Sequence, residues 1–468
     1  MIVEQLYTGC LAQGAYYIES EGEAAIIDPL RDVSAYLRKA EKAGAKIKYI
    51  FETHFHADFV SGHLDLANKT GATIVYGPNA NTSYEVHQAT DGEVFKLGNV
   101  WIKVLHTPGH TLESATYLLM DETGKDHAIF TGDTLFIGDV GRPDLAIKGN
   151  VTERDLAGML YDSLHTKIMP LADDVIVYPA HGAGSACGKN MSKETTDTLG
   201  NQKLFNYALR AKSKDDFVEQ VLDGLSKAPA YFAQNARLNK EGYEPIDAVM
   251  QRGTQALSPA DFEAVVNQTG AVMLDVREAA DFARGFIPNS INIGLNGQFA
   301  PWVGALIPDL KQSIALITPV GLERETIVRL ARVGYDQCVG YLEGGFMAWQ
   351  ATSRETDSIE SISAGAFADR LIQEPNAFIM DVRKPGEFDP EHVRDALNIP
   401  LDTMNEQLAR IPRNDMVYVH CAGGYRSMIA NSILKTRGFD KVVNVEGGMA
   451  AIKKEAPELV NFTPTNAH

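Results

Sequence analysis

Side chains that could bind a metal ion are distributed over four short segments in the first part of the chain. In chain order they are His54, His56, Asp58, His110, Asp133 and His181. Imidazole nitrogens and carboxylate oxygens are the ligands that suit borderline divalent metals. We therefore expect these segments to meet in the folded protein and to bind a metal.

A second set of residues, near the carboxyl end, could form a nucleophilic loop. An apolar run at residues 416–420 leads into Cys421, which is followed by Ala-Gly-Gly-Tyr and then by Arg426. Glycines let such a loop turn its N–H groups inward, and a helix that we expect to begin near Met428 adds partial positive charge. Both features favour a thiolate at Cys421, and Arg426 would complete the cradle around an anion.

The size of this loop favours sulfur chemistry. Four residues separate Cys421 from Arg426, whereas the phosphate-binding loops of tyrosine phosphatases have five. The smaller ring suits the terminal sulfur of a persulfide. We expect Cys421 to be a catalytic residue that transfers sulfur, with Arg426 as its partner.

The expected metal ligands stand where short β-rich runs end. The run at 24–27 ends in Asp28, and the run at 48–51 is followed by His54, with a helical pattern at 33–43 between them. Strands that end in polar loop residues place ligands along one edge of a sheet. The pattern therefore predicts an α/β fold with the metal at a sheet edge.

Beyond the ligands the pattern becomes helical. Residues 201 to about 224 carry an apolar stripe that includes Leu204 and Phe205, and it predicts a helix. Residues 228–245 look irregular, and we place the end of the first domain near residue 252.

The layout of the ligands resembles the metallo-β-lactamase superfamily, whose fold is an αββα sandwich. Its dinuclear hydrolases, such as glyoxalase II, carry the motif His-x-His-x-Asp-His, in which the final His binds the second metal. Phe59 stands at that position here, and a phenyl ring has no lone pair to donate. The resemblance therefore argues against a two-metal hydrolase.

What remains resembles the persulfide dioxygenase branch of the superfamily, in which two His and one Asp hold a single Fe(II). Carried over by motif, the ligands of this facial triad are His54, His110 and Asp133. The residues left for an outer shell that hydrogen-bonds the ligands or iron-bound water are His56, Asp58 and His181. The close spacing of His54 and His56 also allows both to coordinate, so a four-ligand zinc site stays open on these residues.

Two copies of one small α/β pattern follow in tandem. Leu274-Asp-Val-Arg returns as Met380-Asp-Val-Arg, and Glu343-Gly-Gly returns as Glu446-Gly-Gly, at offsets of about 106 and 103 residues. The Asp-Val-Arg and Glu-Gly-Gly-x-x-Ala signatures of both copies resemble the rhodanese domain. We expect a persulfide dioxygenase domain, an inactive rhodanese-like domain and an active rhodanese domain, at residues 1–252, 253–355 and 356–468.

The middle copy lacks the nucleophile. Thr318 aligns with Cys421, Pro319 removes one N–H group from the loop, and Glu323 brings a negative charge into it. We expect this copy to be catalytically silent and to act as a spacer or a packing surface. Its Cys338 is expected to be a small buried apolar residue.

Three further residues are candidates for substrate binding or thiol relay. Cys187 follows His181 by six residues and could carry a persulfide, form a mixed disulfide or support its loop. Arg142 lies in a Gly-Arg-x-Asp segment that resembles one in persulfide dioxygenases, and it could hold the carboxylate or phosphate of a carrier thiol or pair with Asp144. Tyr178 could reach the outer shell of the iron or pack in the core.

Composition limits the partners and the compartment. The chain has 468 residues and a net charge of −18, which argues against nucleic acids and anionic membranes as partners. Its four cysteines show no paired spacing, no run approaches the roughly 20 apolar residues of a membrane span, and no secretory signal is recognisable. We expect a cytoplasmic homo-oligomer, a dimer or a tetramer.

The resemblances imply an enzyme of sulfide detoxification with one Fe(II) per chain. It would oxidise a small thiol persulfide with O₂ to sulfite and would form thiosulfate through Cys421. The sequence does not distinguish glutathione, coenzyme A, bacillithiol or another thiol as the carrier. One alternative is a zinc thioesterase of the glyoxalase II type fused to a sulfurtransferase, for which Phe59 is adverse. The other alternative is a non-catalytic sulfur-carrier scaffold.

Overall fold

The computed structural model describes residues 1–145, 151–225 and 228–462, which form two compact units. The first unit comprises residues 1–249 together with 328–336. The second unit contains the rest of the described chain.

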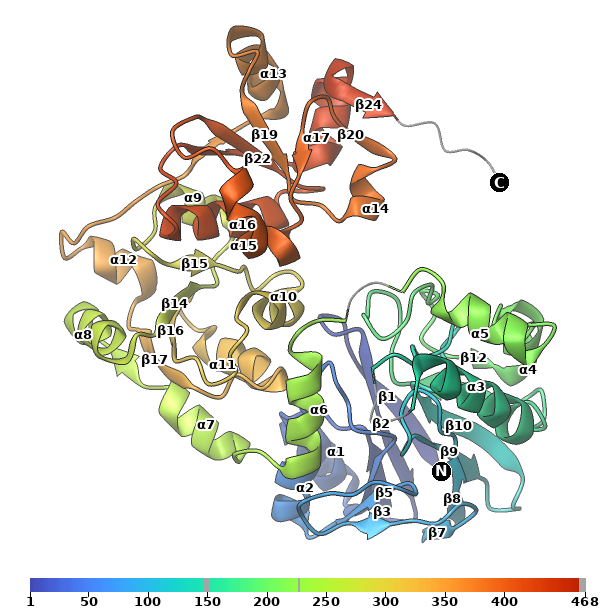
Figure 1. Ribbon diagram of the computed structural model, residues 1–468. Coiled ribbons are helices and arrows are strands. Elements are labelled where there is room, and N and C mark those ends of the chain that lie inside the picture. The colour runs from blue at the N-terminus through green and yellow to red at the C-terminus, as the bar shows by residue number, and fades with distance from the viewer. Residues whose placement is uncertain (146–150, 226–227, 463–468) are drawn as a thin grey trace. The chain divides into compact units, whose positions relative to one another are not determined.

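Two six-stranded sheets form the centre of the first unit (Figure 1). One sheet contains, in spatial order, β1 (Ile2–Thr8), β2 (Gln13–Ser20), β3 (Glu23–Ile27), β4 (Lys46–Glu52), β5 (Thr73–Tyr76) and β6 (His87–Gln88). The other contains β12 (Asp197–Thr198), β11 (Ile176–Pro179), β10 (Asp126–Gly132), β9 (Ala115–Met120), β8 (Val100–His106) and β7 (Val94–Leu97). Strands β3 to β6 are parallel, as are β10 and β11, so each group ends at a common edge.

Apolar side chains fill the space between the two sheets, including Phe51, Tyr117 and Phe130. Helices α1 (Ser34–Ala43) and α2 (His63–Thr70) cover the outer face of the first sheet. Helices α3 (Glu153–Ser163) and α5 (Lys214–Leu222) cover the outer face of the second, and α3 continues into the π-helix η1 (Leu164–Ile168). The αββα sandwich expected from the sequence is confirmed.

The single helix expected from residue 201 to about 224 is two helices, so the prediction of helical structure is confirmed at both ends and was wrong for its continuity. Helix α4 (Leu199–Phe205) ends at Asn206, and α5 begins only after a break. Asn206 terminates the helix because its side-chain amide donates to the backbone carbonyls of Phe136 and Asp139, at 3.3 and 3.0 Å. Leu204 and Phe205 are exposed, not buried in a stripe.

The sequence pattern predicts an irregular segment at 228–245, and this prediction was wrong. The segment contains α6 (Phe232–Glu241), which is followed by α7 (Ile246–Gly253). The pattern misled because α6 buries polar side chains, Asn235 and Asn239, where a surface helix normally buries apolar ones.

A fully buried arginine joins two distant segments of the first unit. Arg31 donates to both carboxylate oxygens of Asp336 at 2.6 and 2.8 Å and to the backbone carbonyl of Ala331 at 3.0 Å. The adjacent carbonyl of Arg332 accepts the N–H of Val60 at 2.7 Å. Residues 328–336 therefore contact the loop that carries the expected ligand His54.

The second unit contains two five-stranded parallel sheets with the same strand order. The first contains β13 (Ala256–Leu257), β17 (Cys338–Leu342), β16 (Ile314–Ile317), β14 (Val272–Asp275) and β15 (Ile291–Asn292). The second contains β18 (Glu360–Ile362), β23 (Val442–Val445), β22 (Val417–His420), β19 (Phe378–Asp381) and β21 (Leu397–Asn398). A small separate sheet pairs β20 (Glu391–Val393) with β24 (Val460–Phe462). The identical order confirms the two tandem copies expected from the repeat.

Helices flank both of these sheets. Those of the first copy are α8 (Pro259–Thr269), α9 (Ala279–Arg284), α10 (Phe299–Leu306), α11 (Glu323–Arg332) and α12 (Gly345–Gln350). Those of the second copy are α13 (Ala364–Gln373), α14 (Pro385–Phe388), α15 (Met404–Gln407), α16 (Tyr425–Thr436) and α17 (Gly448–Glu455), with three short 3₁₀ turns, η2 (Leu401–Thr403), η3 (Leu408–Arg410) and η4 (Pro457–Leu459). Cys421 lies between β22 and α16, as the sequence predicts.

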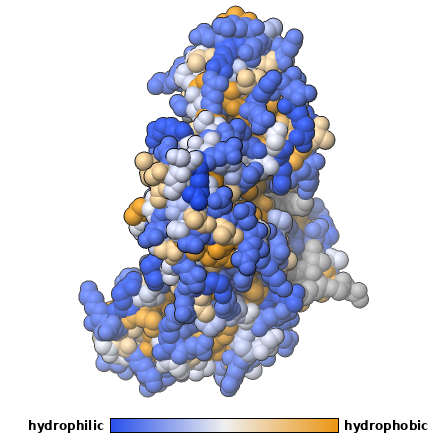
Figure 2. All heavy atoms as spheres, turned by 90° about the vertical axis from the view of Figure 1, so that its left-hand side faces the viewer, coloured by the Kyte–Doolittle hydropathy of each residue, from blue (hydrophilic) through white to orange (hydrophobic). Residues whose placement is uncertain are grey.

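Hydrophilic side chains cover most of the face shown in Figure 2, with apolar residues scattered among them. None of the helices in the described ranges is both long enough and apolar enough to cross a membrane.

We predict that Arg31→Met lowers the free energy of unfolding of the first unit by about 3 kcal/mol, because the buried carboxylate of Asp336 loses its ion pair with Arg31. The double variant Arg31→Met/Asp336→Leu should recover most of this loss. Equilibrium denaturation measures both effects.

The matched control is Lys39→Met, since Lys39 pairs with Glu4 on the surface. Its effect should stay below about 1 kcal/mol. An equal loss in the two single variants would contradict a special role for the buried pair.

Candidate metal site and sulfur-transfer loop

Three of the expected ligands meet at one edge of the sandwich. His54 follows β4, His110 lies between β8 and β9, and Asp133 follows β10. The Nε2 atoms of His54 and His110 lie 3.8 and 3.4 Å from Oδ2 of Asp133. One ligand atom from each residue lies within 4.8 Å of the others, and all three residues are buried. The structure thus brings the predicted triad together.

The second ring nitrogen of each histidine is held by a neighbour. Nδ1 of His110 donates to the backbone carbonyl of Arg142 at 2.9 Å. Nδ1 of His54 lies 3.0 Å from the hydroxyl of Thr53, and that hydroxyl donates to Asp28 at 2.8 Å. A hydroxyl that donates to a carboxylate can accept from Nδ1–H. Both contacts therefore leave Nε2 as the metal-facing atom.

A glycine makes the close approach of the two strand ends possible. Gly132 has φ +52°, and a Cβ at this position would lie 2.5 Å from Oγ1 of Thr53. Any other side chain would separate the His54 loop from the strand that carries Asp133.

The electrostatics of the site suit a metal ion. Burial, and then the nearby histidines, hold the pKa of His54 well below its usual value, so the ring is in the neutral form that binds metal. Neither carboxylate oxygen of Asp133 has a hydrogen-bond partner among the described residues. Buried acceptors are rarely left unsatisfied, and a cation held by this nitrogen–nitrogen–oxygen set would satisfy them.

A second group of polar residues adjoins the triad. Nε2 of His181 lies 3.5 Å from Oδ2 of Asp58 and 3.6 Å from Oδ1 of Asp133. Phe59 is fully buried, with its ring centroid 4.3 Å from that of His56 and 6.4 Å from that of His181. A hydrocarbon ring therefore stands beside the polar group formed by Asp58 and His181.

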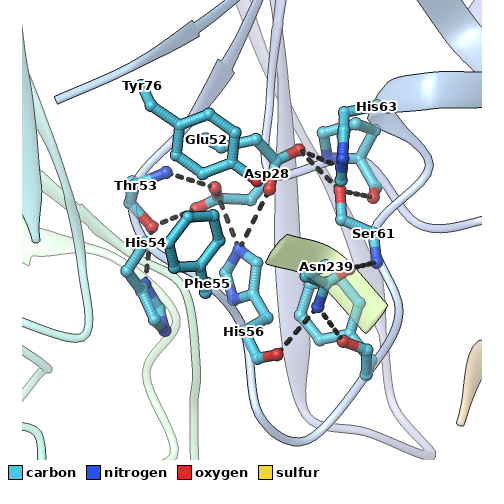
Figure 3. A network of polar contacts seen from close by, with 12 residues as sticks. Asp28, Glu52, Thr53, His54, Phe55, His56, Ser61, His63, Tyr76 and Asn239 are labelled. Atoms are coloured by element: carbon cyan, nitrogen blue, oxygen red, sulfur yellow. Dashed lines mark hydrogen bonds and ion pairs between the residues drawn. The ribbon is translucent and has the colours of Figure 1, made fainter. Parts of the chain in front are cut away.

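His56 is directed mainly at carboxylates. Its Nε2 lies 3.0 Å from Oδ1 of Asp28 and 3.7 Å from Oε2 of Glu52, and Figure 3 shows the ring pointing toward Asp28. Burial alone would lower the pKa of His56, but the nearby carboxylates outweigh it and raise the pKa to about 9. A ring nitrogen of His56 also lies within 4.8 Å of Asp58 and His181.

Glu52 begins a buried polar network that the sequence analysis missed. Ser61 donates to Glu52 at 2.5 Å, and Nδ1 of His63 lies 3.6 Å from the same carboxylate (Figure 3). The amide of Asn239 on α6 donates to the backbone carbonyls of His56 and Phe59, both at 2.8 Å. Only a three-dimensional contact identifies Asn239, because it lies 180 residues or more from the loop that it fixes.

The three further candidates have different surroundings. Cys187 is buried, with its sulfur within 4.8 Å of ligand atoms of Asp133 and His181, and burial followed by the charges of nearby carboxylates raises its pKa well above the usual value. Arg142 pairs with Asp144 through two contacts of 2.7 Å. Tyr178 stacks on Phe130 with ring centroids 5.2 Å apart and packs in the core between the sheets.

The loop after β22 surrounds a buried sulfur. The N–H of Gly424 donates to Sγ of Cys421 at 3.1 Å, and the side chain of Ser427 lies 3.7 Å from the same atom. Arg426 is held by Glu387 through two contacts of 2.6 and 2.7 Å, which lower the pKa of that carboxylate. Contact with Glu387 is a feature that sequence reasoning missed.

The Glu-Gly-Gly signature of the last copy packs directly against the backbone of the Cys421 loop. Gly448 has φ +52°, and a Cβ there would lie 2.3 Å from the backbone oxygen of Cys421. The N–H of Met449 donates to that oxygen at 2.7 Å. The second glycine of the signature is therefore required by the close approach of the two loops.

In the corresponding loop of the middle copy, a carboxylate of the loop itself accepts a backbone N–H. The N–H of Gly321 lies 3.0 Å from both carboxylate oxygens of Glu323. The hydroxyl of Thr318 is buried and has no hydrogen-bond partner in the part of the chain that the structure describes. This loop therefore has no thiol, and the N–H of Gly321 is already bound to the carboxylate of Glu323.

Comparisons with known proteins agree with this architecture. Residues 8–181 match the family model described as the metallo-beta-lactamase superfamily, and residues 258–352 and 363–455 each match the rhodanese-like domain. A crystal structure of a metallo-beta-lactamase from Staphylococcus aureus subsp. aureus COL has a TM-score of 0.65 and 31% identity, covering 73% of this chain and 98% of that one.

The curated relatives carry two kinds of name. Probable hydroxyacylglutathione hydrolase glo2 of Schizosaccharomyces pombe is 34% identical over 34% of this chain. Persulfide dioxygenase ETHE1, mitochondrial, of Homo sapiens is 31% identical over 34% of this chain. The chain spans 58% and 59% of the lengths of these relatives.

We predict that Phe59→His raises metal occupancy from one to two ions per chain, because the new imidazole would join Asp58 and His181 beside Asp133. Metal analysis by mass spectrometry measures the occupancy. The parent chain should bind one ion.

A matched control is Phe55→His, in the same loop, where the side chain packs against Tyr76 with ring centroids 5.0 Å apart. This variant should keep single occupancy. Two ions in the parent chain would contradict the argument from Phe59.

Proposed function

Because the chain belongs to the metallo-β-lactamase superfamily and carries two rhodanese-like domains, we propose that it is a persulfide dioxygenase joined to a sulfurtransferase. The first site would convert a persulfide RSSH, O₂ and water to the thiol RSH, sulfite and two protons. The Cys421 site would use a second sulfur to convert sulfite to thiosulfate. The enzyme would act in the reducing cytoplasm, which suits its four free cysteines.

The observation that carries this proposal is the fully buried phenyl ring of Phe59 beside Asp58 and His181. It replaces a ligand of the second metal and leaves His54, His110 and Asp133 as a complete set for one metal. Two histidines and one carboxylate are the ligand set of mononuclear non-haem Fe(II) oxygenases. The resemblance to the human persulfide dioxygenase supports the same activity.

His54, His110 and Asp133 would hold Fe(II), which when bound would supply the chemistry of O₂ activation. The protein contributes orientation and exclusion of water. Thr53 and the Arg142 carbonyl fix the two imidazoles, while Phe59 and the buried network around Glu52 keep the loop dry and rigid. Cys187 lies beside the triad and, because burial raises its pKa, we infer that it is a protonated thiol there.

Sulfur transfer would proceed in two balanced steps. The thiolate of Cys421 attacks the terminal sulfur of RSSH, which forms the enzyme persulfide and releases RSH. Sulfite then attacks the outer sulfur, so that thiosulfate leaves and the thiolate returns. The N–H of Gly424, 3.1 Å from Sγ, stabilises the negative charge on sulfur in both steps, and Arg426 attracts the anionic acceptor.

A second candidate is a zinc-dependent thioesterase, and one observation favours it. Asp58, His181 and Oδ1 of Asp133 still form a compact polar group beside the triad, as a second metal would require. The names of the hydroxyacylglutathione hydrolase relatives point the same way. The absence of a histidine at position 59 is why we prefer the dioxygenase.

We predict that Asp133→Ala abolishes iron binding and persulfide-dependent oxygen uptake, because two imidazoles alone hold Fe(II) weakly. Metal analysis of anaerobically purified protein and an oxygen electrode give the two readouts. Sulfur transfer from thiosulfate to a thiol should persist in this variant.

The control is Asp126→Ala, at the opposite end of β10, which should keep both iron and oxygen uptake. Iron and oxygen uptake retained in Asp133→Ala would overturn the triad. Two zinc ions and thioester hydrolysis in the parent chain would favour the second candidate.

We predict that Cys421→Ser leaves oxygen uptake unchanged and shifts the product from thiosulfate to sulfite, since a serine hydroxyl does not carry sulfane sulfur. Ion chromatography of the products, corrected for non-enzymatic capture of sulfite, measures the ratio. Thr318→Ala is the matched variant in the silent loop and should change neither product nor rate. Thiosulfate as the main product of Cys421→Ser would assign the transfer to another thiol.

A further inference from the structure

Helix α16, which follows the Cys421 loop, is buried on all sides. Every residue from Ser427 to Leu434 is buried, although a helix that packs on a single sheet normally exposes one face. The additional cover comes from the middle copy, because α16 packs against β15 (Figure 1). The catalytic helix therefore lies between two rhodanese-like copies.

Tyr425, the first residue of α16, makes the contact nearest to the reactive sulfur. Its hydroxyl donates to the backbone carbonyl of Gly294 in the middle copy at 2.7 Å. Its ring lies on two glycines: a Cβ at Gly297 would be 2.6 Å from Cε2 and Cζ, and a Cβ at Gly294 would be 3.4 Å from Cε2. The middle copy thus provides both an acceptor and a surface without side chains for this ring.

Other contacts hold the same surfaces together. The N–H of Asn292 in β15 donates to the hydroxyl of Ser432 on α16 at 3.0 Å. Met428, one turn after the catalytic loop, packs in an apolar cluster with Phe282 and Phe286 of the middle copy. Polar and apolar contacts therefore fix α16 along its first two turns.

The position of Tyr425 matters because of its neighbours in the chain. Gly424 donates its N–H to Sγ of Cys421, and Arg426 is the cation of the loop. A shift of Tyr425 would move both neighbours, and charge-assisted hydrogen bonds depend strongly on distance and angle. The middle copy is thus placed to control the geometry around the sulfur.

We infer that the catalytically silent middle copy is a positioning element for sulfur transfer, acting through the contact of Tyr425 with Gly294 and Gly297. This inference rests on the sulfur-transfer function proposed above. It gives the middle copy a role that needs no nucleophile of its own. Tyr425 is a positioning residue and not a catalytic one.

The test is Gly297→Ala in the full-length chain. Gly297 is not among the residues with positive φ, so alanine is compatible with its backbone, and the added methyl group would displace the Tyr425 ring. The kcat for sulfur transfer from thiosulfate to a thiol, expressed per titrated Cys421, should fall about tenfold, as expected when overpacking costs on the order of 1–2 kcal/mol. The KM for thiosulfate should change by less than about twofold.

A double-variant cycle separates positioning from general damage. Tyr425→Ala removes the ring, so Gly297→Ala should cause no further loss of kcat in that background. Tyr425→Phe, which keeps the ring and loses only the hydrogen bond, should lower the kcat for sulfur transfer a few-fold. Gly365→Ala is the matched glycine control, because the nearest atom to its added Cβ is 4.0 Å away.

Each outcome decides one question. Independent, additive losses in the cycle, or an unchanged kcat in Gly297→Ala, would overturn the inference. Oxygen uptake at the metal site and the rate of Cys421 alkylation by iodoacetamide, followed by peptide mapping, show whether the variants fold and whether the loop has moved. A parent chain that transfers no sulfur would overturn the proposed function instead. In that case, a rate of Cys421 alkylation that changes in Gly297→Ala but not further in the Tyr425→Ala background would still support the positioning contact.

Discussion

Asp133 is a buried carboxylate with imidazoles on both sides, and the metal site is arranged around it. Oδ2 faces His54 and His110 at 3.8 and 3.4 Å, and Oδ1 faces His181 at 3.6 Å. An ionised carboxylate in such a position is costly unless positive charge compensates it. Because strands of both sheets end at this edge, their loops can bring three imidazoles to one carboxylate. The αββα architecture thus places nitrogen donors from several loops around one buried carboxylate.

Residue types at strand ends were enough to predict the group of possible metal ligands and the Cys421 loop, and the internal repeat predicted the tandem copies. The triad of His54, His110 and Asp133 was predicted only from the resemblance to a known family. These features depend on local motifs, which the sequence displays directly. Asn239 was missed because its role is to satisfy backbone groups of a loop far away in the chain, and a helix that buries polar residues has no amphipathic pattern. For Tyr178 the sequence left two alternatives open, the outer shell of the metal or the core, and the structure stacks its ring on Phe130 in the core.

The two rhodanese-like copies show how one fold can keep or lose a cysteine in the same loop. In the last copy, the N–H of Gly424 faces the sulfur of Cys421, while in the middle copy the N–H of Gly321 faces the carboxylate of Glu323. A loop whose N–H groups converge is stable when an anion accepts them. The middle copy supplies that anion from its own chain. A different surface of this copy, at β15, packs against α16.

At position 59 the path of the backbone does not depend on the side chain. The backbone there is fixed without help from the side chain, since Asn239 accepts the N–H of Ser61 at 2.9 Å and donates to the carbonyl of Phe59 at 2.8 Å. The Phe59 ring packs on the ring of His56, which two carboxylates hold in place. A change between histidine and phenylalanine can thus alter the number of metal ligands while the loop keeps its path. If position 59 determines whether a second metal binds, as we propose, a single side chain on a fixed backbone would separate the two candidate functions.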